Sequence, residues 1–139
     1  EYLEENDAFI RENNLEIFMN EENEERILMD KSAFKRIIDN VLINSIRYRE
    51  KEKSRINITI QRNEGKIFWK IGDDGPGVAE EDLEKIFESF CRLDTSRTHC
   101  GEGSGLGLAI VKRIVIDHHG ILYARNKNGL EICMEFPAV

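Results

Sequence analysis

Two asparagines in a helical stretch are the first residues whose type and spacing suggest chemistry. Asn40 and Asn44 are four residues apart, so a helix through DNVLINSIRY places both side chains on one face, and Arg47 extends that row. An amide oxygen is a suitable ligand for a hard cation, and Mg²⁺ takes few protein ligands together with water and substrate phosphates. The row predicts that Asn44 holds Mg²⁺ on a nucleotide, with Asn40 beside it and Arg47 reaching phosphate. An exposed polar helix face gives the same pattern, so for this pair alone both interpretations stay open.

A second candidate is an aspartate at the end of an apolar run. In IGDDGPGV, Asp73 ends a predicted strand, and Gly75 and Gly77 let the backbone turn sharply beneath whatever the carboxylate faces. A carboxylate accepts hydrogen bonds and donates none. It therefore suits the exocyclic amine of adenine and rejects guanine, whose corresponding edge is a carbonyl oxygen. Because Asp, Gly and Pro all favour turns, the segment by itself is equally consistent with an ordinary loop.

A third candidate is a glycine-rich segment that leads into a helix. GEGSGLGLAIVKRIV carries Gly103, Gly105 and Gly107 at alternate positions, and a helix start offers free N–H groups and a dipole that favour phosphate. The segment is not a P-loop, because no Gly-Lys-Ser/Thr follows, nor a dinucleotide-binding fingerprint, because no strand immediately precedes it. Seven of the ten glycines lie in the windows 72–77 and 101–107, which predicts two loops around one ligand.

Helices that position these residues can be predicted from the spacing of apolar side chains. A long helix is predicted over 31–49, with Asp30 as its N-cap. A short amphipathic helix is predicted over 79–90, and another over about 104–118 that ends near Gly120.

Strands are predicted from alternating apolar and polar residues. They fall at 15–19, 26–29, 56–61 and 66–71, the last two joined by a loop at 63–65. A final hairpin, ILYARN and LEICMEF, turns at Lys127-Asn128-Gly129. Together the elements predict an α/β two-layer sandwich, with a mixed sheet of about five strands covered on one face by three helices.

Length and charge limit the class of protein. A chain of 139 residues suits one domain, and it has no apolar run of the roughly 20 residues that a membrane span needs. Residues 1–30 carry eleven acidic and two basic side chains, and the remainder carries sixteen and eighteen. This distribution lacks the basic stripe of a nucleic-acid-binding protein, so we expect no nucleic-acid partner. Because the chain begins at Glu1, we expect it to be a piece of a longer protein.

Cysteine and histidine usage gives no metal or redox site. The spacing of the three cysteines matches no such motif, and the histidines lack the spaced partners of a zinc site. We therefore expect a reducing, cytoplasmic location. The residues concerned are Cys91, Cys100, Cys133, His99, His118 and His119.

Four motifs in this order resemble the ATP-binding catalytic domain of bacterial sensor histidine kinases, in the superfamily of gyrase, heat-shock-chaperone and mismatch-repair ATPases. DNVLINSIRY resembles the N box, GDDGPG the G1 box, IFESFCRLD the F box and GSGLGLAIVKRIV the G2 box. The resemblance covers about residues 15–137. It implies a catalytic domain over 15–139, preceded over 1–14 by a remnant of the connection to a helical domain. His119 departs from the pattern, because a second glycine is common there in the family.

The resemblance also implies a role for each motif residue in a Mg·ATP site. Asn44 coordinates Mg²⁺ with support from Asn40, Asp73 binds the adenine amine, and Arg47 and Tyr48 line the phosphate and nucleoside side. Residues 91–103 form a mobile lid. The further implied residues are Arg92 and Arg97 as catalytic arginines, and Gly75, Gly77, Gly103, Ser104, Gly105, Leu106, Gly107 and Leu108 as nucleotide contacts.

One position distinguishes a kinase from a hydrolase. Hydrolases of the superfamily resemble one another in carrying Glu one turn before the metal-binding Asn, where it activates water. Here that position is Asn40, an amide that is no general base at neutral pH. The adjacent Asp39 points about 100° away around the helix.

The resemblance therefore implies transfer of the γ-phosphate to a histidine. The acceptor lies on a separate dimerisation domain, because no histidine of this chain has the helical context of one. A response regulator downstream, a membrane-anchored parent and a monomeric isolated domain are also expected. An ATP hydrolase and an inactive nucleotide-binding interaction module remain as alternatives.

Overall fold

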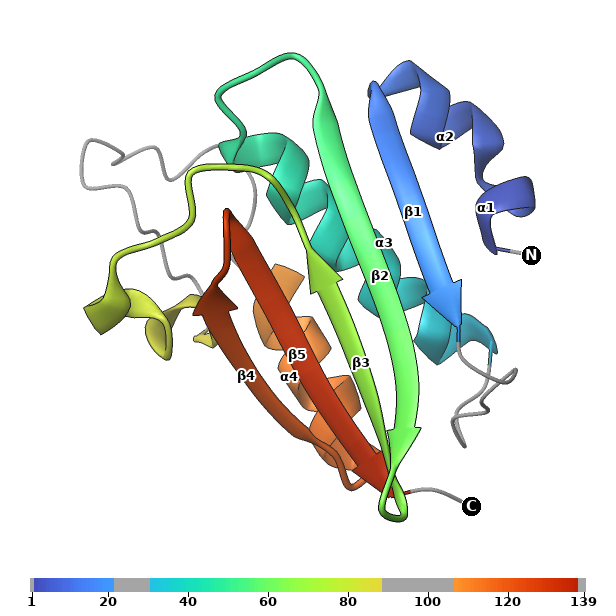
Figure 1. Cartoon of the computed structure of the whole chain (residues 1–139), viewed down its shortest axis with the longest axis vertical. Helices are drawn as coiled ribbons and strands as arrows, with labels where there is room; N and C mark the ends of the chain where they lie inside the picture. The colour runs from blue at the N-terminus through green and yellow to red at the C-terminus, as the bar shows by residue number, and fades with distance from the viewer. Residues whose placement is uncertain (1, 22–30, 89–106, 138–139) are drawn as a thin grey trace.

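A mixed five-stranded sheet organises the chain (Figure 1). The computed structural model describes residues 2–21, 31–88 and 107–137. The strands are β1 (Leu15–Glu21), β2 (Ser54–Asn63), β3 (Lys66–Gly72), β4 (Ile121–Asn126) and β5 (Leu130–Pro137). The helices are α1 (Tyr2–Glu5), α2 (Asp7–Glu12), α3 (Lys31–Tyr48) and α4 (Gly107–Asp117), with two 3₁₀ turns, η1 (Glu80–Asp82) and η2 (Lys85–Phe87).

The strand order β1-β2-β3-β5-β4 gives the sheet its mixed character. β1 and β2 are parallel, and every other neighbouring pair is antiparallel. A parallel pair needs a crossover connection, and α3 supplies it between β1 and β2. Figure 1 shows α3 and α4 on the same face of the sheet. The predicted two-layer α/β sandwich is therefore confirmed, whereas the predicted strand at 26–29 and the Asp30 cap lie outside the described residues.

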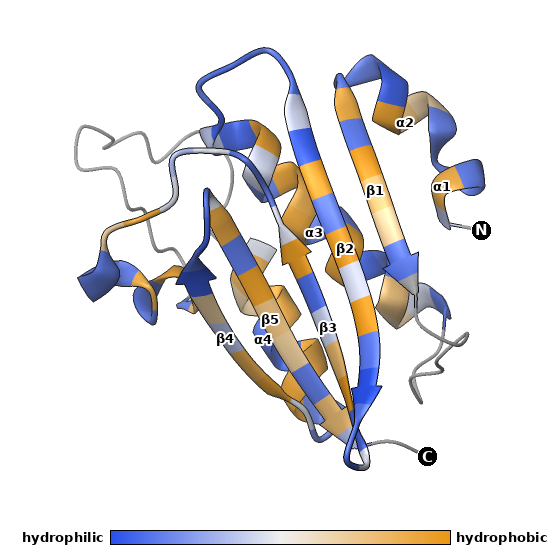
Figure 2. Ribbon diagram, viewed as in Figure 1, coloured by the Kyte–Doolittle hydropathy of each residue, from blue (hydrophilic) through white to orange (hydrophobic). Residues whose placement is uncertain are grey.

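Alternating apolar side chains form the core between the sheet and the two long helices. Ile56, Ile58 and Ile60 of β2 are buried on one face, while the residues between them face outward. Figure 2 shows this alternation of hydrophobic and hydrophilic residues along the strands. Trp69 of β3 lies fully buried against Phe34 of α3, with ring centroids 4.8 Å apart and planes 8° from parallel. This packing fixes α3 on the sheet and so fixes the direction of its polar row.

Both predicted hairpins are present, with a small difference in the first. Asn63 pairs with Lys66 at the end of the ladder, so the loop is only Glu64-Gly65. Both loop residues have positive φ, +49° and +78°, as a tight two-residue turn requires. The second hairpin turns at 127–129, as predicted.

The predicted helix over 79–90 is wrong over the residues that the structure describes. Residues 79–88 form the two short 3₁₀ turns instead, with extended backbone at Ala79 and Glu88. Glu80 and Glu84 would repel each other one turn apart in an α-helix. Ile86 and Phe87 are consecutive and both buried, which the side-chain spacing of one α-helix face does not provide. Among the described residues, α3 and α4 are therefore the long helices that cover this face of the sheet.

His119 and Gly120 end α4, the first through its backbone conformation and the second through its close packing. His119 adopts the left-handed conformation at φ +62°, and the Gly120 N–H donates to the Val115 carbonyl at 2.8 Å. Gly120 itself is close-packed, because a Cβ there would lie 2.8 Å from atoms of Phe136 and Val115. The helix ends near Gly120 as predicted, but the left-handed residue is His119.

The N-terminal segment contacts the middle of α3 and the residue that follows the helix. Tyr2 is 7% exposed and its hydroxyl donates a hydrogen bond to Asp39. The Arg49 guanidinium donates to the Asn13 carbonyl at 2.7 Å. These contacts join residues 2–13 to the domain, while the boundary at residue 15 stays a prediction. None of the helices within the described ranges has the length and apolar character to span a membrane.

Candidate nucleotide-binding site

A cavity of about 390 Å³ lies where α3, the carboxyl end of β3 and the start of α4 meet. Asn44, Ser45 and Tyr48 line it from α3. The glycine-containing loop after β3 and the buried start of α4 complete its wall, through Asp73, Gly75, Pro76, Gly77, Val78 and Leu108. The structure thus brings three separate sequence motifs to one hollow.

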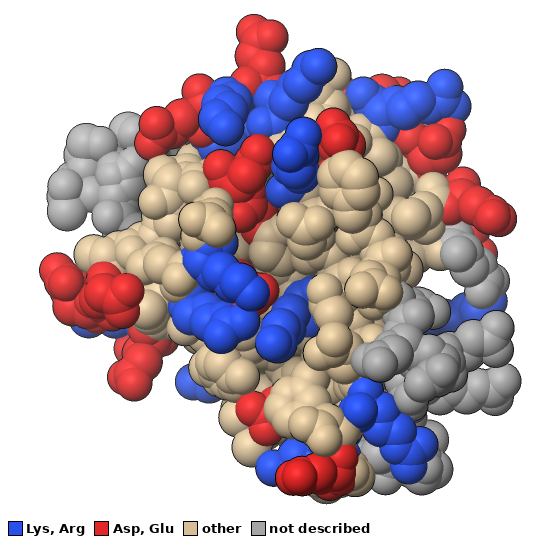
Figure 3. Space-filling view, in the orientation of Figure 1, with Lys and Arg blue, Asp and Glu red and all other residues tan. Residues whose placement is uncertain are grey.

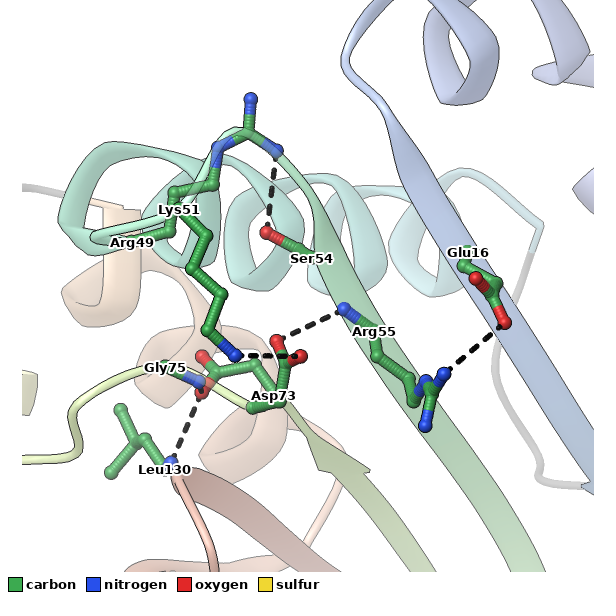
Figure 4. Close-up of polar contacts among 9 residues, drawn as sticks. Glu16, Arg49, Lys51, Ser54, Arg55, Asp73, Gly75 and Leu130 are labelled. Carbon is green, nitrogen blue, oxygen red and sulfur yellow. Dashed lines mark hydrogen bonds and ion pairs between the residues drawn. The ribbon is translucent and has the colours of Figure 1, made fainter.

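The carboxylate of Asp73 is held by three hydrogen bonds. Its Oδ1 accepts the backbone N–H groups of Gly75, at 2.9 Å, and Leu130, at 3.1 Å (Figure 4). Its Oδ2 accepts the Ser45 hydroxyl at 2.7 Å. The Asp73 N–H also donates to the Leu130 carbonyl at 3.0 Å. Asp73 is therefore fixed from its own loop, from β5 and from α3.

Close packing of the β4–β5 turn adds to this restraint. Gly129 has φ +139°, and a Cβ at this position would lie 2.1 Å from the Asp73 carbonyl oxygen. Only a residue without a side chain allows the turn to approach the backbone of Asp73 so closely. The sequence suggested Gly129 as a turn residue and gave no signal for this second role.

Asn126 fixes the next part of the loop. Its Oδ1 accepts the Val78 N–H at 3.0 Å, and its Nδ2 donates to the Val78 carbonyl at 2.7 Å. The side chain thus replaces a strand partner for Val78. Gly77, at φ +72°, passes so close that a Cβ would lie 2.5 Å from the Asn126 Oδ1. The loop after β3 is therefore bound to the end of β4.

The two predicted metal-site asparagines lie in different surroundings. Asn44 lines the cavity, and among the described residues its side chain has no hydrogen-bond partner. Asn40 does not line the cavity. Its Nδ2 donates to the Arg36 carbonyl at 2.7 Å, and a Cβ on Gly107 would lie 3.4 Å from its Oδ1. Asn40 therefore lies where α3 and α4 meet, and Arg47 is exposed outside the cavity.

Asp39 is turned away from the cavity, as its position on the helix predicted. It accepts the Tyr2 hydroxyl and forms an ion pair with Lys35 at 2.6 Å. Burial and the neighbouring Asp39 carboxylate raise the pKa of Tyr2 well above its ordinary value, so the hydroxyl stays a donor.

The second aspartate of the DDGPG motif has a different environment. Asp74 accepts the backbone N–H of Arg55 at 3.0 Å and pairs with Lys51 at 3.8 Å. It does not line the cavity. Of two identical neighbouring side chains, only Asp73 belongs to the site.

The predicted lid and hinge residues cannot be placed. Arg92, Arg97, Gly103, Ser104, Gly105 and Leu106 lie outside the described residues. Gly107 begins α4, and Leu108 is buried against the cavity. Of the predicted site residues in the second glycine-rich motif, the structure therefore describes only Gly107 and Leu108.

Ser45 lines the cavity and was not among the predicted site residues, although the sequence carries a signal for it. It continues the buried row of α3 that includes Ile38, Val41 and Leu42, where the helix period predicts an apolar side chain. A hydroxyl at such a position indicates a specific polar partner. The Asn126 side chain and the Leu130 backbone N–H bind segments that only the folded sheet brings near them, which no local pattern reveals.

The open face of the sheet carries a second hollow, of about 490 Å³, whose lining includes Phe18, Asn57 and Asp74. Figure 3 shows basic and acidic side chains interspersed over this face. Burial, foremost, raises the pKa of the Cys133 thiol to about 11, so the reactive thiolate is disfavoured. Within the described ranges, His, Cys, Asp and Glu side chains form no group of three that could hold a metal ion.

Residues 29–139 match the family described as histidine kinase-, DNA gyrase B- and HSP90-like ATPases. The chain belongs to this family. Its members include the sensor histidine kinases that the motifs resemble, and the chain is an ATP-binding catalytic domain of the histidine kinase type.

Known relatives and structures agree with this assignment. The probable sensor kinase SilS of Salmonella typhimurium is 44% identical over 91 residues, which are 66% of this chain and 18% of that protein. The chain thus spans about a fifth of this relative's length. The mycobacterial sensor histidine kinase MprB superposes with a TM-score of 0.83 at 26% identity, over 99% of this chain and 93% of that chain.

A third comparison includes a partner protein. The histidine kinase ThkA, solved in complex with the response regulator TrrA, matches with a TM-score of 0.76 at 26% identity. The match covers 99% of this chain and 38% of that kinase. The fold of the domain is therefore that of a histidine kinase catalytic domain.

Proposed function

We propose that this domain binds Mg·ATP and donates the γ-phosphate to a histidine on a separate helical dimerisation domain of the same parent protein. The observation that carries the proposal is the Asp73 carboxylate, fixed by three hydrogen bonds in a cavity that Asn44 also lines. Membership of the histidine kinase-like ATPase family supports it.

The residues of the cavity fit adenine at one end. Asp73 offers only acceptor atoms, which match an exocyclic amine and oppose a carbonyl oxygen. Gly75 and Gly77 leave space beside the carboxylate, and Tyr48 adds an aromatic ring to the wall. The cavity therefore selects adenine over guanine.

The α3 side of the cavity fits Mg²⁺ and phosphate. The Asn44 amide oxygen is a hard ligand, and Mg²⁺ keeps waters and substrate phosphates as its other ligands. Asn40 lies beside Gly107 at the start of α4, the helix that contains the end of the second glycine-rich motif. Arg47, Arg92 and Arg97, with residues 103–108, complete the phosphate end in this proposal. Bound Mg²⁺ supplies charge neutralisation to the triphosphate.

α3 offers no general base near Asn44 that could activate water, and this favours transfer to a protein nucleophile over hydrolysis. Asn40 cannot remove a proton from water, and the Asp39 carboxylate is engaged by Tyr2 and Lys35. The same proposal includes a downstream response regulator, like the one solved with ThkA. It also includes the acceptor histidine and a membrane-anchored parent protein that holds this domain in the cytoplasm.

Nucleotide selectivity tests the binding half of this proposal. Mg·ATP at about 100 times its dissociation constant should stabilise the domain by about 2.7 kcal/mol, seen as a rise in Tm. Mg·GTP at the same concentration should give little change. Equal stabilisation by both nucleotides would contradict the adenine assignment.

Phosphate transfer tests the other half. The domain is mixed with the helical domain of its parent and with ATP labelled at the γ-phosphate, and acid-labile phosphohistidine is measured. Label on the helical domain is the expected result. Steady release of phosphate without label supports a hydrolase instead, and binding without either reaction supports an inactive interaction module.

A further inference from the structure

Ser45 is a buried hydroxyl that joins α3 to the floor of the cavity. Its side chain is in the buried row of α3, and the residue is 6% exposed. A serine within a helix often donates to the carbonyl of the preceding turn, which here belongs to Val41. The Ser45 hydroxyl instead donates across to Asp73 Oδ2 at 2.7 Å. The contact therefore connects two motifs that are 28 residues apart in sequence.

The bonding of the carboxylate shows why this contact matters. Asp73 Oδ1 already accepts two backbone N–H groups, from Gly75 and Leu130, which occupy its two lone-pair directions. Oδ2 accepts only Ser45 among the described residues and keeps one direction for a ligand. The atom that meets a base is therefore the atom that Ser45 holds.

We propose that Ser45 is a positioning residue for base selection: its hydroxyl fixes Asp73 Oδ2 so that the open lone pair meets an exocyclic amine. This inference rests on the proposed function. After donating its hydrogen to Oδ2, the Ser45 oxygen has only acceptor capacity toward the cavity that it lines. Ser45 and Asp73 together thus present acceptors alone, and a carbonyl oxygen finds no donor there.

Removal of the hydroxyl should weaken discrimination more than binding as a whole. In a Ser45→Ala variant, water replaces the hydroxyl beside Oδ2. A water molecule can turn to donate or to accept, so it can bridge the carboxylate to a carbonyl oxygen as well as to an amine. Alanine is a favourable residue within a helix, so the variant is expected to fold.

The test compares ATP with inosine triphosphate, whose purine carries a carbonyl oxygen at position 6 in place of the amine. The ratio of their dissociation constants, measured with Mg²⁺ present, reports recognition of the amine. We expect Ser45→Ala to reduce this ratio by about tenfold, because the replacing water accommodates a carbonyl oxygen as well as an amine. Ser45→Thr keeps the hydroxyl and should keep a ratio near that of the unmodified domain.

A matched control removes a different buried serine. Ser54 at the start of β2 accepts a hydrogen bond from Arg49 and does not line the cavity. Ser54→Ala should leave the ratio unchanged, even where it lowers Tm. A general loss of structure would lower affinity for both triphosphates and leave their ratio unchanged.

The results separate this inference from the proposed function. If the unmodified domain binds neither triphosphate, or binds both equally, the adenine assignment fails and the role of Ser45 fails with it. If the unmodified domain prefers ATP and Ser45→Ala keeps that preference in full, only the role of Ser45 is overturned. Loss of the preference in both Ser45→Ala and Ser45→Thr would assign the effect to packing and also overturn it.

Discussion

The carboxylate of Asp73 and the amide of Asn44 line the same cavity but are held in different ways. Asp73 accepts three hydrogen bonds from α3, its own loop and β5, and Gly129 packs directly on its backbone. The Asn44 amide has no hydrogen-bond partner among the described residues and is oriented only by its helix.

In the proposed function, this difference separates a base end that is already formed from a phosphate end that the ligand completes. Fixed hydrogen-bonding groups discriminate between bases because they cannot adapt to the wrong one. A metal ligand faces another requirement, since Mg²⁺ takes most of its ligands from water and phosphate. We therefore infer that the fold itself builds the base end, whereas Mg·ATP assembles the phosphate end around Asn44.

The largest expected effect on stability comes from substitution of Gly129, which packs against the backbone of Asp73. Gly129→Ala places a Cβ against the Asp73 carbonyl at a positive φ, so the turn must move. We expect the free energy of unfolding to fall by roughly 3 kcal/mol, measured by urea denaturation.

Gly65 provides the comparison for this change. It also has a positive φ, +78°, but a Cβ there meets nothing within 4 Å. Gly65→Ala should cost about 1 kcal/mol and leave ATP affinity unchanged. Equal costs at the two positions would show that the approach of Gly129 to Asp73 is not a restraint.

The next effect concerns the two neighbouring aspartates. Asp73→Asn presents an amide donor to the adenine amine, or to one of the N–H groups that now bind the carboxylate. ATP affinity should fall by roughly 1–3 kcal/mol, measured by calorimetry. Asp74→Asn changes the same side chain outside the cavity and should leave affinity unchanged. Similar losses of ATP affinity in both variants would contradict the assignment of Asp73 as the residue that binds adenine.

A smaller effect is expected at the phosphate end. Asn44→Ala should weaken ATP binding roughly tenfold when Mg²⁺ is present and little when the metal is chelated, because the amide acts through the ion. Asn57→Ala, on the open face of the sheet, serves as the control. A loss of the same size without Mg²⁺ would mean that Asn44 contacts the nucleotide directly or supports the fold.

The sequence predicted the parts of this molecule whose signals are local. The 3.6-residue period defined α3, the alternation of Ile56, Ile58 and Ile60 defined β2, and the glycines marked the loop after Asp73. Asp73 and Asn44 were predicted as site residues because their motifs occur together in one order, since each motif alone also fits an ordinary loop or an exposed helix face.

Other features depend on contacts between distant segments. The helix predicted over 79–90 failed because the burial of Ile86 and Phe87 outweighs a periodic pattern. The bonds from Asn126 to Val78 and from Leu130 to Asp73 arise only after β4 and β5 have joined the sheet. A turn asparagine and a strand leucine give no sign of these roles in the sequence.

The smallest effect is expected at Tyr2, which holds α3 from its outer side through Asp39. Tyr2→Phe removes this hydrogen bond and should lower the free energy of unfolding by about 1 kcal/mol at pH 8. Because Tyr2 does not line the cavity, the preference for ATP over GTP should not change. A changed preference would mean that base recognition depends on the N-terminal segment as well as on the sheet.

The pH dependence gives a second measurement of the same contact. The folded state raises the pKa of Tyr2 above its usual value near 10, so the phenol stays protonated while that of the unfolded chain ionises. The stabilisation from Tyr2 is complete below pH 10 and decreases as the pH rises further. The difference in unfolding free energy between the unmodified domain and Tyr2→Phe should therefore shrink from pH 8 to pH 11. A difference that stays constant with pH would place the Tyr2 hydroxyl in solvent.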